Sequence, residues 1–154
     1  METPAELIPH RPPFLLVDAI TGEKAGADGL PAELEARFTI DPQSPLFANI
    51  YPGHYPDSPV TPGVILCEIA FQTGALLMAK RLQADTAREG VKGVPVITRI
   101  RDARFKRMVK PGETLDITAA FDEQAGNAYY LDAKITVGGE LALKVAFTCA
   151  LIAQ

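Results

Sequence analysis

Apolar and polar residues alternate along three segments of the chain. In the segment 141–151 every second residue is apolar, and shorter alternations cover 115–121 and 33–40. Successive side chains of a β-strand point to opposite faces of a sheet, so a period of two is typical of a strand with one buried face. The pattern therefore predicts half-buried strands in all three segments.

Glycine pairs separate the late alternating segments. Gly126-Asn127 and Gly138-Gly139 are typical of two-residue hairpin turns. We therefore expect an antiparallel meander in the second half of the chain. Three earlier glycines predict a turn before the strand at 33–40; they are Gly22, Gly26 and Gly29.

Prolines gather in two segments. The segment 7–20 places three prolines before a short apolar run, which indicates a rigid arm leading into a first strand or short helix. Between 52 and 62 the chain has Pro52, Pro56, Pro59 and Pro62. Such a density excludes both a helix and a central strand there, so this segment is predicted to be a stiff loop.

A single long helix is predicted from Pro62 to about Leu82. Thr61 suits the N-cap and Pro62 the first helical position, while Lys80 and Arg81 suit the negative end of the helix dipole. Apolar residues occupy nearly every side of this segment, which is typical of a helix enclosed by the rest of the fold. The helix is therefore expected to form the core.

One enclosed helix, followed after a polar linker at 83–93 by a meander, predicts a single α+β domain over residues 1–154. In this arrangement a curved antiparallel sheet wraps around one long central helix, which is the hotdog fold. A chain of 154 residues buries enough apolar surface to need no disulfide or metal. Cys67 and Cys149 lie in apolar runs and are expected to be buried thiols in a reducing compartment.

The composition excludes several classes of protein. With 22% charged residues and a formal net charge of −4, neither long disorder nor bulk nucleic-acid binding is expected. No cationic segment with a signal-length apolar run opens the chain, and the most hydrophobic stretch is interrupted by Glu68, Gln72 and Thr73. We expect a cytoplasmic protein without a membrane or nucleic-acid partner.

Glu68 is an ionisable residue inside an otherwise apolar stretch of the predicted helix. A charged carboxylate is costly in an apolar interior, so Glu68 either pairs with an arginine or lysine or stays protonated. A protonated carboxylic acid can donate to a departing hydroxide, which makes Glu68 a candidate general acid. Gln72 lies one turn later on the same face, where its amide would hold the carboxyl group or bond a neighbouring strand.

His54 is one of two histidines and lies in the proline-rich loop shortly before the predicted helix. Backbone N–H groups point outward at a helix N-terminus, so the segment supplies the parts of an acid/base site. A lone loop histidine is more often a surface residue than a catalyst. The surrounding motif decides between these readings.

Three motifs carry a family resemblance. The sequence Gly-His-Tyr-Pro-Asp-Ser-Pro-Val-Thr-Pro-Gly-Val-Ile-Leu-Cys-Glu at 53–68 closely resembles the active-site signature of the (3R)-hydroxyacyl-acyl-carrier-protein dehydratases of bacterial fatty acid synthesis. The fourteen-residue interval from His54 to Glu68 also matches. Residues 8–18 resemble the opening of that family, and residues 103–112 resemble its central strand.

The resemblance implies a dehydratase that forms a trans-2-enoyl thioester. It implies that His54 removes the proton beside the thioester carbonyl, while Glu68 of a facing subunit protonates the 3-hydroxyl group as it leaves. An N–H at the helix start, for which Gly63 is the candidate, would stabilise the oxyanion that develops. His10 receives only a structural role in the opening motif. No cofactor is implied beyond the phosphopantetheine of the carrier protein, and a homodimer or a trimer of dimers is expected.

Residues 99–110 form a basic segment in an acidic chain. The segment contains six basic residues and one acidic residue; the basic ones are Arg99, Arg101, Arg104, Lys106, Arg107 and Lys110. Such local asymmetry suggests an anionic partner. Because acyl carrier proteins are acidic, Arg99, Arg104, Lys106 and Arg107 are candidate contacts for the carrier protein or its phosphopantetheine. An ordinary solvated strand face is the alternative.

The chain departs from the family at the predicted tunnel mouth. Asp57-Ser58 stands where the family has Gly-Asn, Thr61 where it has Met, and Arg99 lies in a stretch that lacks the usual aromatic residues. These changes leave the acyl chain length open. A hotdog acyl thioesterase and a non-catalytic acyl-binding scaffold remain alternatives, whereas double-bond isomerisation is not expected because the isomerising relatives have aspartate at the position of Glu68.

Overall fold

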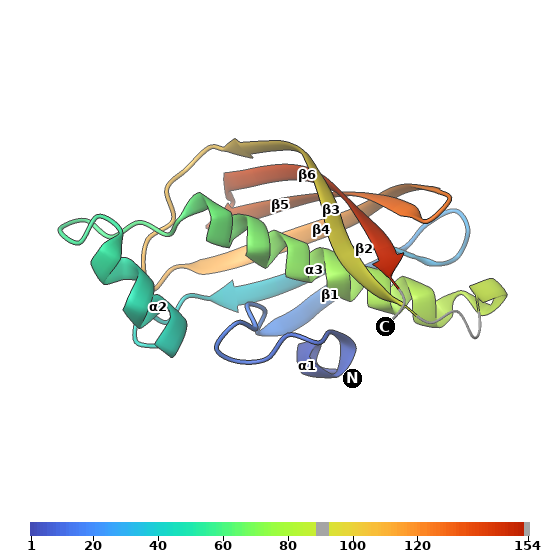
Figure 1. Ribbon diagram of the computed structural model, residues 1–154, viewed down its shortest axis with the longest axis horizontal. Coiled ribbons are helices and arrows are strands. Elements are labelled where there is room, and N and C mark those ends of the chain that lie inside the picture. The colour runs from blue at the N-terminus through green and yellow to red at the C-terminus, as the bar shows by residue number, and fades with distance from the viewer. Residues whose placement is uncertain (89–92, 153–154) are drawn as a thin grey trace.

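A six-stranded antiparallel sheet and one long helix make up most of the fold in the computed structural model, which describes residues 1–88 and 93–152 (Figure 1). The strands are β1 (Ala19–Ala25), β2 (Pro31–Thr39), β3 (Val94–Phe105), β4 (Thr114–Ala125), β5 (Ala128–Val137) and β6 (Glu140–Ile152). Their order in the sheet is β1-β2-β4-β5-β6-β3. Helix α3 (Gly63–Ala84) lies across one face of the sheet and packs on β2, β4 and β5.

The predicted meander is confirmed. Strands β4, β5 and β6 are consecutive antiparallel neighbours, joined at the two glycine pairs. Gly126, Gly138 and Gly139 have φ angles of 60°, 57° and 81°, a region of backbone conformation that glycine adopts without steric cost. The alternation in β6 also holds, because Leu143, Val145, Phe147 and Cys149 are all buried against α3 and its surroundings; both cysteines are free, buried thiols.

Strand β3 lies at the edge of the sheet, whereas its motif resembles a central strand. It pairs with β6 and, within the described part of the chain, with no other strand. Two register shifts interrupt that pairing, and several large apolar side chains of β3 are exposed: Val96, Ile97, Ile100 and Phe105. An edge with unpaired backbone groups and exposed apolar residues is a template for pairing with another strand.

Helix α3 begins one residue later than predicted. Pro62 is its N-cap, with extended ψ of 137°, and Thr61 does not cap the helix. The Thr61 hydroxyl instead bonds the Tyr51 hydroxyl at 2.7 Å, and its N–H donates to the Val109 carbonyl. The predicted enclosure of the helix also fails in the first turn, where Val64 is 76% exposed, although later turns are buried.

The arm and the loops differ from the expected pattern in detail. The chain starts with a short helix, α1 (Pro4–Leu7), and β1 follows the proline-rich arm. Gly22 lies in β1 at a register shift rather than in the turn, which spans 26–29. A short helix that the pattern did not predict, α2 (Pro45–Ile50), leads through the 3₁₀ turn η1 (Tyr51–Gly53) into the loop with His54.

The region predicted as a polar linker at 83–93 is only partly described. Helix α3 extends to Ala84 and the 3₁₀ turn η2 (Thr86–Arg88) follows, whereas residues 89–92 lie outside the described structure. By length and hydropathy α3 would pass for a membrane span. More than half of that stretch is buried inside the fold, which is how the core helix of a globular domain behaves.

Candidate active site

The loop before α3 fixes the ring of His54. Its Nδ1 atom lies 2.7 Å from the carbonyl oxygen of Val60, and its ring meets Tyr55 edge-on at 4.8 Å between centroids. A carbonyl only accepts hydrogen bonds, so Nδ1 carries the ring hydrogen and Nε2 keeps a free lone pair. Tyr55 itself has a φ of 56°, a sparsely populated conformation for a residue with a side chain. The loop therefore presents a neutral imidazole whose outer nitrogen can accept a proton.

His54 and Gly63 line one open groove of about 490 Å³. Its other lining residues come from the loop, from α3 and from the segment after β3: Tyr55, Val60, Thr61, Leu66, Phe105, Lys106, Arg107, Met108 and Val109. Three of the predicted functional residues other than Gly63 thus share this groove, His54 with Lys106 and Arg107. The structure brings the candidate base, the helix start and part of the basic segment together.

Gly63 is the first residue of α3 and has no room for a side chain. A Cβ atom there would lie 2.9 Å from the ring of Phe105. The N–H groups of Ile65 and Leu66 donate to the carbonyl of Pro62, whereas the Gly63 N–H has no acceptor among the described residues. A free N–H at the positive end of a long helix is suited to an anionic oxygen.

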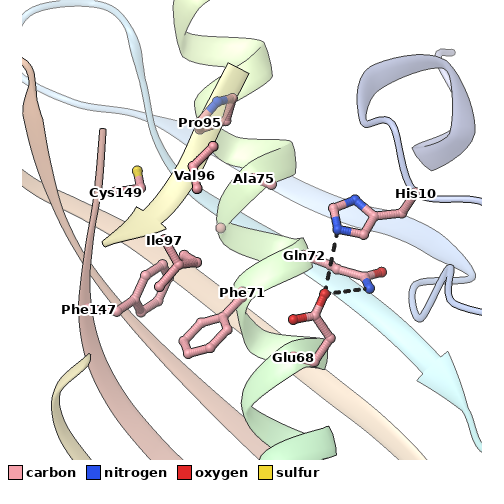
Figure 2. Close-up of a pocket in the computed structure, with 11 residues that line it drawn as sticks. His10, Glu68, Phe71, Gln72, Ala75, Pro95, Val96, Ile97, Phe147 and Cys149 are labelled. Atoms are coloured by element: carbon pink, nitrogen blue, oxygen red, sulfur yellow. Dashed lines mark hydrogen bonds and ion pairs between the residues drawn. The ribbon is translucent and has the colours of Figure 1, made fainter. Parts of the chain in front are cut away.

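Glu68 lines a different and more apolar pocket, of about 260 Å³ (Figure 2). The wall of this pocket comes from α3, the first residues of β3 and the middle of β6: His10, Phe71, Gln72, Gly74, Ala75, Pro95, Val96, Ile97, Phe147 and Cys149. The carboxyl group is not fully buried as expected, because the Glu68 side chain is 24% exposed. Burial and the apolar surroundings raise the pKa of the Cys149 thiol to about 11.

Gln72 holds the carboxyl group of Glu68, as its helical spacing predicted. Its Nε2 atom donates to Glu68 Oε1 at 3.0 Å and to the Phe14 carbonyl at 2.8 Å. Its Oε1 atom accepts from the Leu16 N–H at 2.7 Å. The amide is only 1% exposed, so these bonds replace hydration that it cannot have. Both readings of Gln72 therefore hold together, since it ties the N-terminal arm to α3 and orients Glu68.

The second neighbour of Glu68 is His10, which sequence reasoning assigned to a structural role. His10 Nε2 lies 3.5 Å from Glu68 Oε1, and its ring stacks on Phe14 at 6.4 Å between centroids. The expected alternatives for Glu68, an arginine or a lysine, are not its partners in the described part of the chain. The signal available in the sequence was that His10 is one of only two histidines.

His54 and Glu68 do not share a pocket within one chain. Gly63, beside His54, and Glu68 are five residues apart on one helix. At 3.6 residues per turn they are separated by about 1.4 turns and face different sides of the helix. A single chain therefore holds the two candidate groups on separate surfaces.

The basic segment is largely paired within the chain. Arg107 forms a bidentate ion pair with Glu113, both distances being 2.8 Å, and a further one with Glu140 at 3.0 Å. This guanidinium lowers the pKa of the Glu113 carboxyl group to about 2. Arg104 bonds Asp102 at 3.0 Å. Of the four candidate contacts, Arg99 and Lys106 are exposed and have no ion-pair partner among the described residues.

Comparison with known sequences gives a consistent family. Residues 8–146 match the FabA-like domain. The chain is 35% identical over 143 residues to the 3-hydroxyacyl-[acyl-carrier-protein] dehydratase FabZ of Rickettsia felis, which covers 93% of this chain and 89% of that protein. It is 36% identical over 143 residues to the FabZ of Rickettsia akari, with the same coverage of both proteins.

Solved structures share the fold at lower sequence identity. The dehydratase heterocomplex ApeI:P from Xenorhabdus doucetiae matches with a TM-score of 0.76 and 14% identity, over 100% of this chain and 93% of that one. A hypothetical thioesterase from Streptococcus pneumoniae, solved with coenzyme A, matches with a TM-score of 0.59 and 15% identity, over 88% and 85%. The predicted hotdog fold is confirmed. The chain belongs to the FabA-like domain family, and within that family its sequence is similar to the FabZ 3-hydroxyacyl-[acyl-carrier-protein] dehydratases.

Proposed function

We propose that this protein dehydrates 3-hydroxyacyl-acyl-carrier-protein to trans-2-enoyl-acyl-carrier-protein in fatty acid or related acyl chain biosynthesis. His54 Nε2 accepts the proton from C2, and the electrons of that C–H bond form the double bond between C2 and C3. The C3–O bond breaks, and Glu68 gives its proton to the departing oxygen, so that one water molecule leaves. The observation that carries this proposal is the hydrogen bond to Val60 that leaves Nε2 of His54 free to act as the base.

The reaction passes through an enolate-like state on the thioester carbonyl. The Gly63 N–H lies at the start of a helix in the same groove as His54, which supports a role in binding that oxygen. Removing one oxyanion donor costs about 10²- to 10³-fold in rate in other enzymes. We propose Gly63 as this donor because its missing side chain leaves the N–H accessible beside Phe105.

The acid and the base are proposed to come from two chains. Within one chain His54 and Glu68 line separate pockets, so neither pocket alone contains both groups. The exposed edge of β3 supports pairing with the same strand of a second copy, which would place this strand in the middle of a continuous sheet. A homodimer is the smallest assembly that completes the site, and a trimer of dimers would contain the same pair.

Acyl carrier protein is the proposed partner, and no other cofactor is needed because the proposed chemistry uses only an acid and a base. Arg99 and Lys106 are exposed next to the two ends of β3, which supports a role for them in binding an acidic partner. Arg104 and Arg107 are proposed as weaker contacts because carboxylates of this chain already pair with them. A cytoplasmic location fits a partner of this kind.

Two inactive variants test the proposed two-chain site. The purified protein is incubated with 3-hydroxyacyl-carrier-protein substrates of several chain lengths, and the enoyl product is followed by mass spectrometry. We expect His54→Ala and Glu68→Gln each to lower turnover by about 10²- to 10⁴-fold. Refolding the two variants together creates mixed dimers with one intact site, so about a quarter of the wild-type activity should return at equal amounts.

The same assay distinguishes the alternatives. Release of free 3-hydroxy acid in place of enoyl product would favour an acyl thioesterase. Absence of any turnover from a folded oligomer would favour the scaffold alternative. If the mixed variants stay inactive although they form mixed dimers, the site does not combine His54 of one chain with Glu68 of the other.

A further inference from the structure

We infer that His10 is a positioning residue for Glu68, holding one carboxylate oxygen so that the other faces the substrate. This inference rests on the proposed function, because it assumes that Glu68 is the acid. It assigns a role in the reaction to a histidine of the N-terminal arm, far from both Glu68 and His54 in the sequence.

The two oxygens of Glu68 have different surroundings. Oε1 accepts a hydrogen bond from Gln72 at 3.0 Å and lies 3.5 Å from His10 Nε2. Figure 2 shows both contacts converging on this oxygen, while the second oxygen points away from His10 and Gln72. That second oxygen has no hydrogen-bond partner among the described residues. Two neighbours on one oxygen therefore fix the direction in which the other oxygen can deliver a proton.

His10 has no other polar task in the described structure. Its Nδ1 atom is buried and has no hydrogen-bond partner there. The arm is held by other groups, since Gln72 bonds Phe14 and Leu16 and the Arg11 side chain bonds the carbonyls of Ile8 and His10. A histidine that only supported the arm would be expected to bond it through a ring nitrogen. The one polar atom that His10 directs at a partner is Nε2, and the partner is Glu68.

The distance of 3.5 Å suits a contact that shortens when substrate is bound. It is longer than the usual range of about 2.7 to 3.2 Å for an N–H···O bond. Catalytic hydrogen bonds are often long without substrate and tighten in the reacting complex. His10 is about a quarter exposed and lines the pocket wall, so a small rotation of its ring brings Nε2 to bonding distance.

Two substitutions separate the polar contact from the packing of the ring. His10→Phe keeps an aromatic ring to stack on Phe14 but loses the Nε2–H donor. His10→Gln loses the ring but places an amide N–H close to the same position. If His10 positions Glu68, kcat of His10→Phe falls about 10- to 100-fold with KM nearly unchanged, and His10→Gln recovers most of the loss.

A double-mutant cycle with Glu68→Gln tests whether His10 acts through the carboxyl group. In the Glu68→Gln background His10→Phe should cause no further loss of kcat, because its target is already gone. Equal losses in both backgrounds, or full activity of His10→Phe, would overturn the inference. Thermal unfolding and size-exclusion chromatography show whether each variant is folded and assembled like the wild type.

The same set of variants keeps this inference distinct from the proposed function. If Glu68→Gln retains wild-type activity, the assignment of Glu68 as the acid fails first. If Glu68→Gln is inactive but His10→Phe is as active as the wild type, only the role of His10 fails. Should His10→Phe prove unstable, the ratio of kcat for His10→Gln and His10→Ala, at matched folded fraction, decides the same question: equal values contradict the inference.

Discussion

His54 donates the hydrogen on Nδ1 to the main-chain carbonyl of Val60 across 2.7 Å, within the loop that the two residues share. This single bond selects the tautomer of the ring and its direction. The base of the proposed reaction is thus prepared by the backbone of its own loop rather than by a second acidic side chain.

The tautomer of His54 can be observed directly. In ¹⁵N NMR spectra at a pH where the rings are neutral, we expect the Nδ1 signal of His54 to be that of a protonated nitrogen and the Nε2 signal that of a free one. Because the chain has only two histidines, the His10→Gln variant assigns the signals. A protonated Nε2 on His54 would contradict the hydrogen bond to Val60.

Replacing Gln72 by leucine is expected to lower both stability and activity. The change leaves the Leu16 N–H and the Phe14 carbonyl without their partner in a buried region. Each lost partner costs about 1 to 3 kcal/mol, so the free energy of unfolding should fall by roughly 2 to 4 kcal/mol. Urea denaturation measures the loss. Gln83→Leu, at an exposed position of α3, is the control and should change stability little.

Gly74→Ala should destabilise the protein although alanine favours helix. A Cβ atom at this position would lie 2.7 Å from the ring of Phe147, which is 1% exposed and enclosed by the core. Overpacking of this kind costs about 1 to 3 kcal/mol, against a gain of about 1 kcal/mol in helix propensity. The melting temperature should therefore fall, and Phe147→Leu added to Gly74→Ala should restore part of it. An increase in melting temperature for Gly74→Ala alone would show that the ring can move aside.

The ion pair of Arg107 with Glu113 predicts a specific pH dependence of stability. The pKa of Glu113 is lowered from 4.5 to about 2 in the folded protein, so the pair stabilises the fold fully above about pH 4.5. That contribution is lost as the pH falls toward 2. Glu113→Gln should therefore be less stable than the wild type at pH 7, with a difference that shrinks over this window. Asp116→Asn, at the exposed pair with Arg37, is the control; an equal effect there would contradict the prediction.

Charge reversal distinguishes the exposed cations from the paired ones. We expect Arg99→Glu and Lys106→Glu to raise KM for carrier-linked substrate, more strongly at low salt, because they change the field that an acidic partner meets. KM for a short pantetheine thioester should change less, since that substrate lacks the acidic domain. Arg104→Glu should have a smaller effect because Asp102 already pairs with Arg104. Equal KM changes with both substrates would indicate that the two cations do not contact the carrier protein.

Much of the fold followed from local rules. The period of two in β2, β4 and β6 and the glycine pairs between the late strands predicted the meander, because side-chain alternation and positive φ are properties of a few neighbouring residues. The same rules missed α2 and shifted the start of α3. Thr61 has the chemistry of an N-cap, but its hydroxyl bonds Tyr51 instead, a contact that depends on where α2 and η1 lie.

The sequence by itself determined the family, the fold class and the identity of the two candidate reacting groups, since these depend on residue types and their spacing along the chain. Only the tertiary structure decided that His10 approaches Glu68, that Arg107 is occupied by Glu113, and that His54 and Glu68 lie in separate pockets. Each of these facts joins segments from different elements of the fold. Spacing along a chain does not fix such distances, because they arise from how the arm, the helix and the sheet pack on one another.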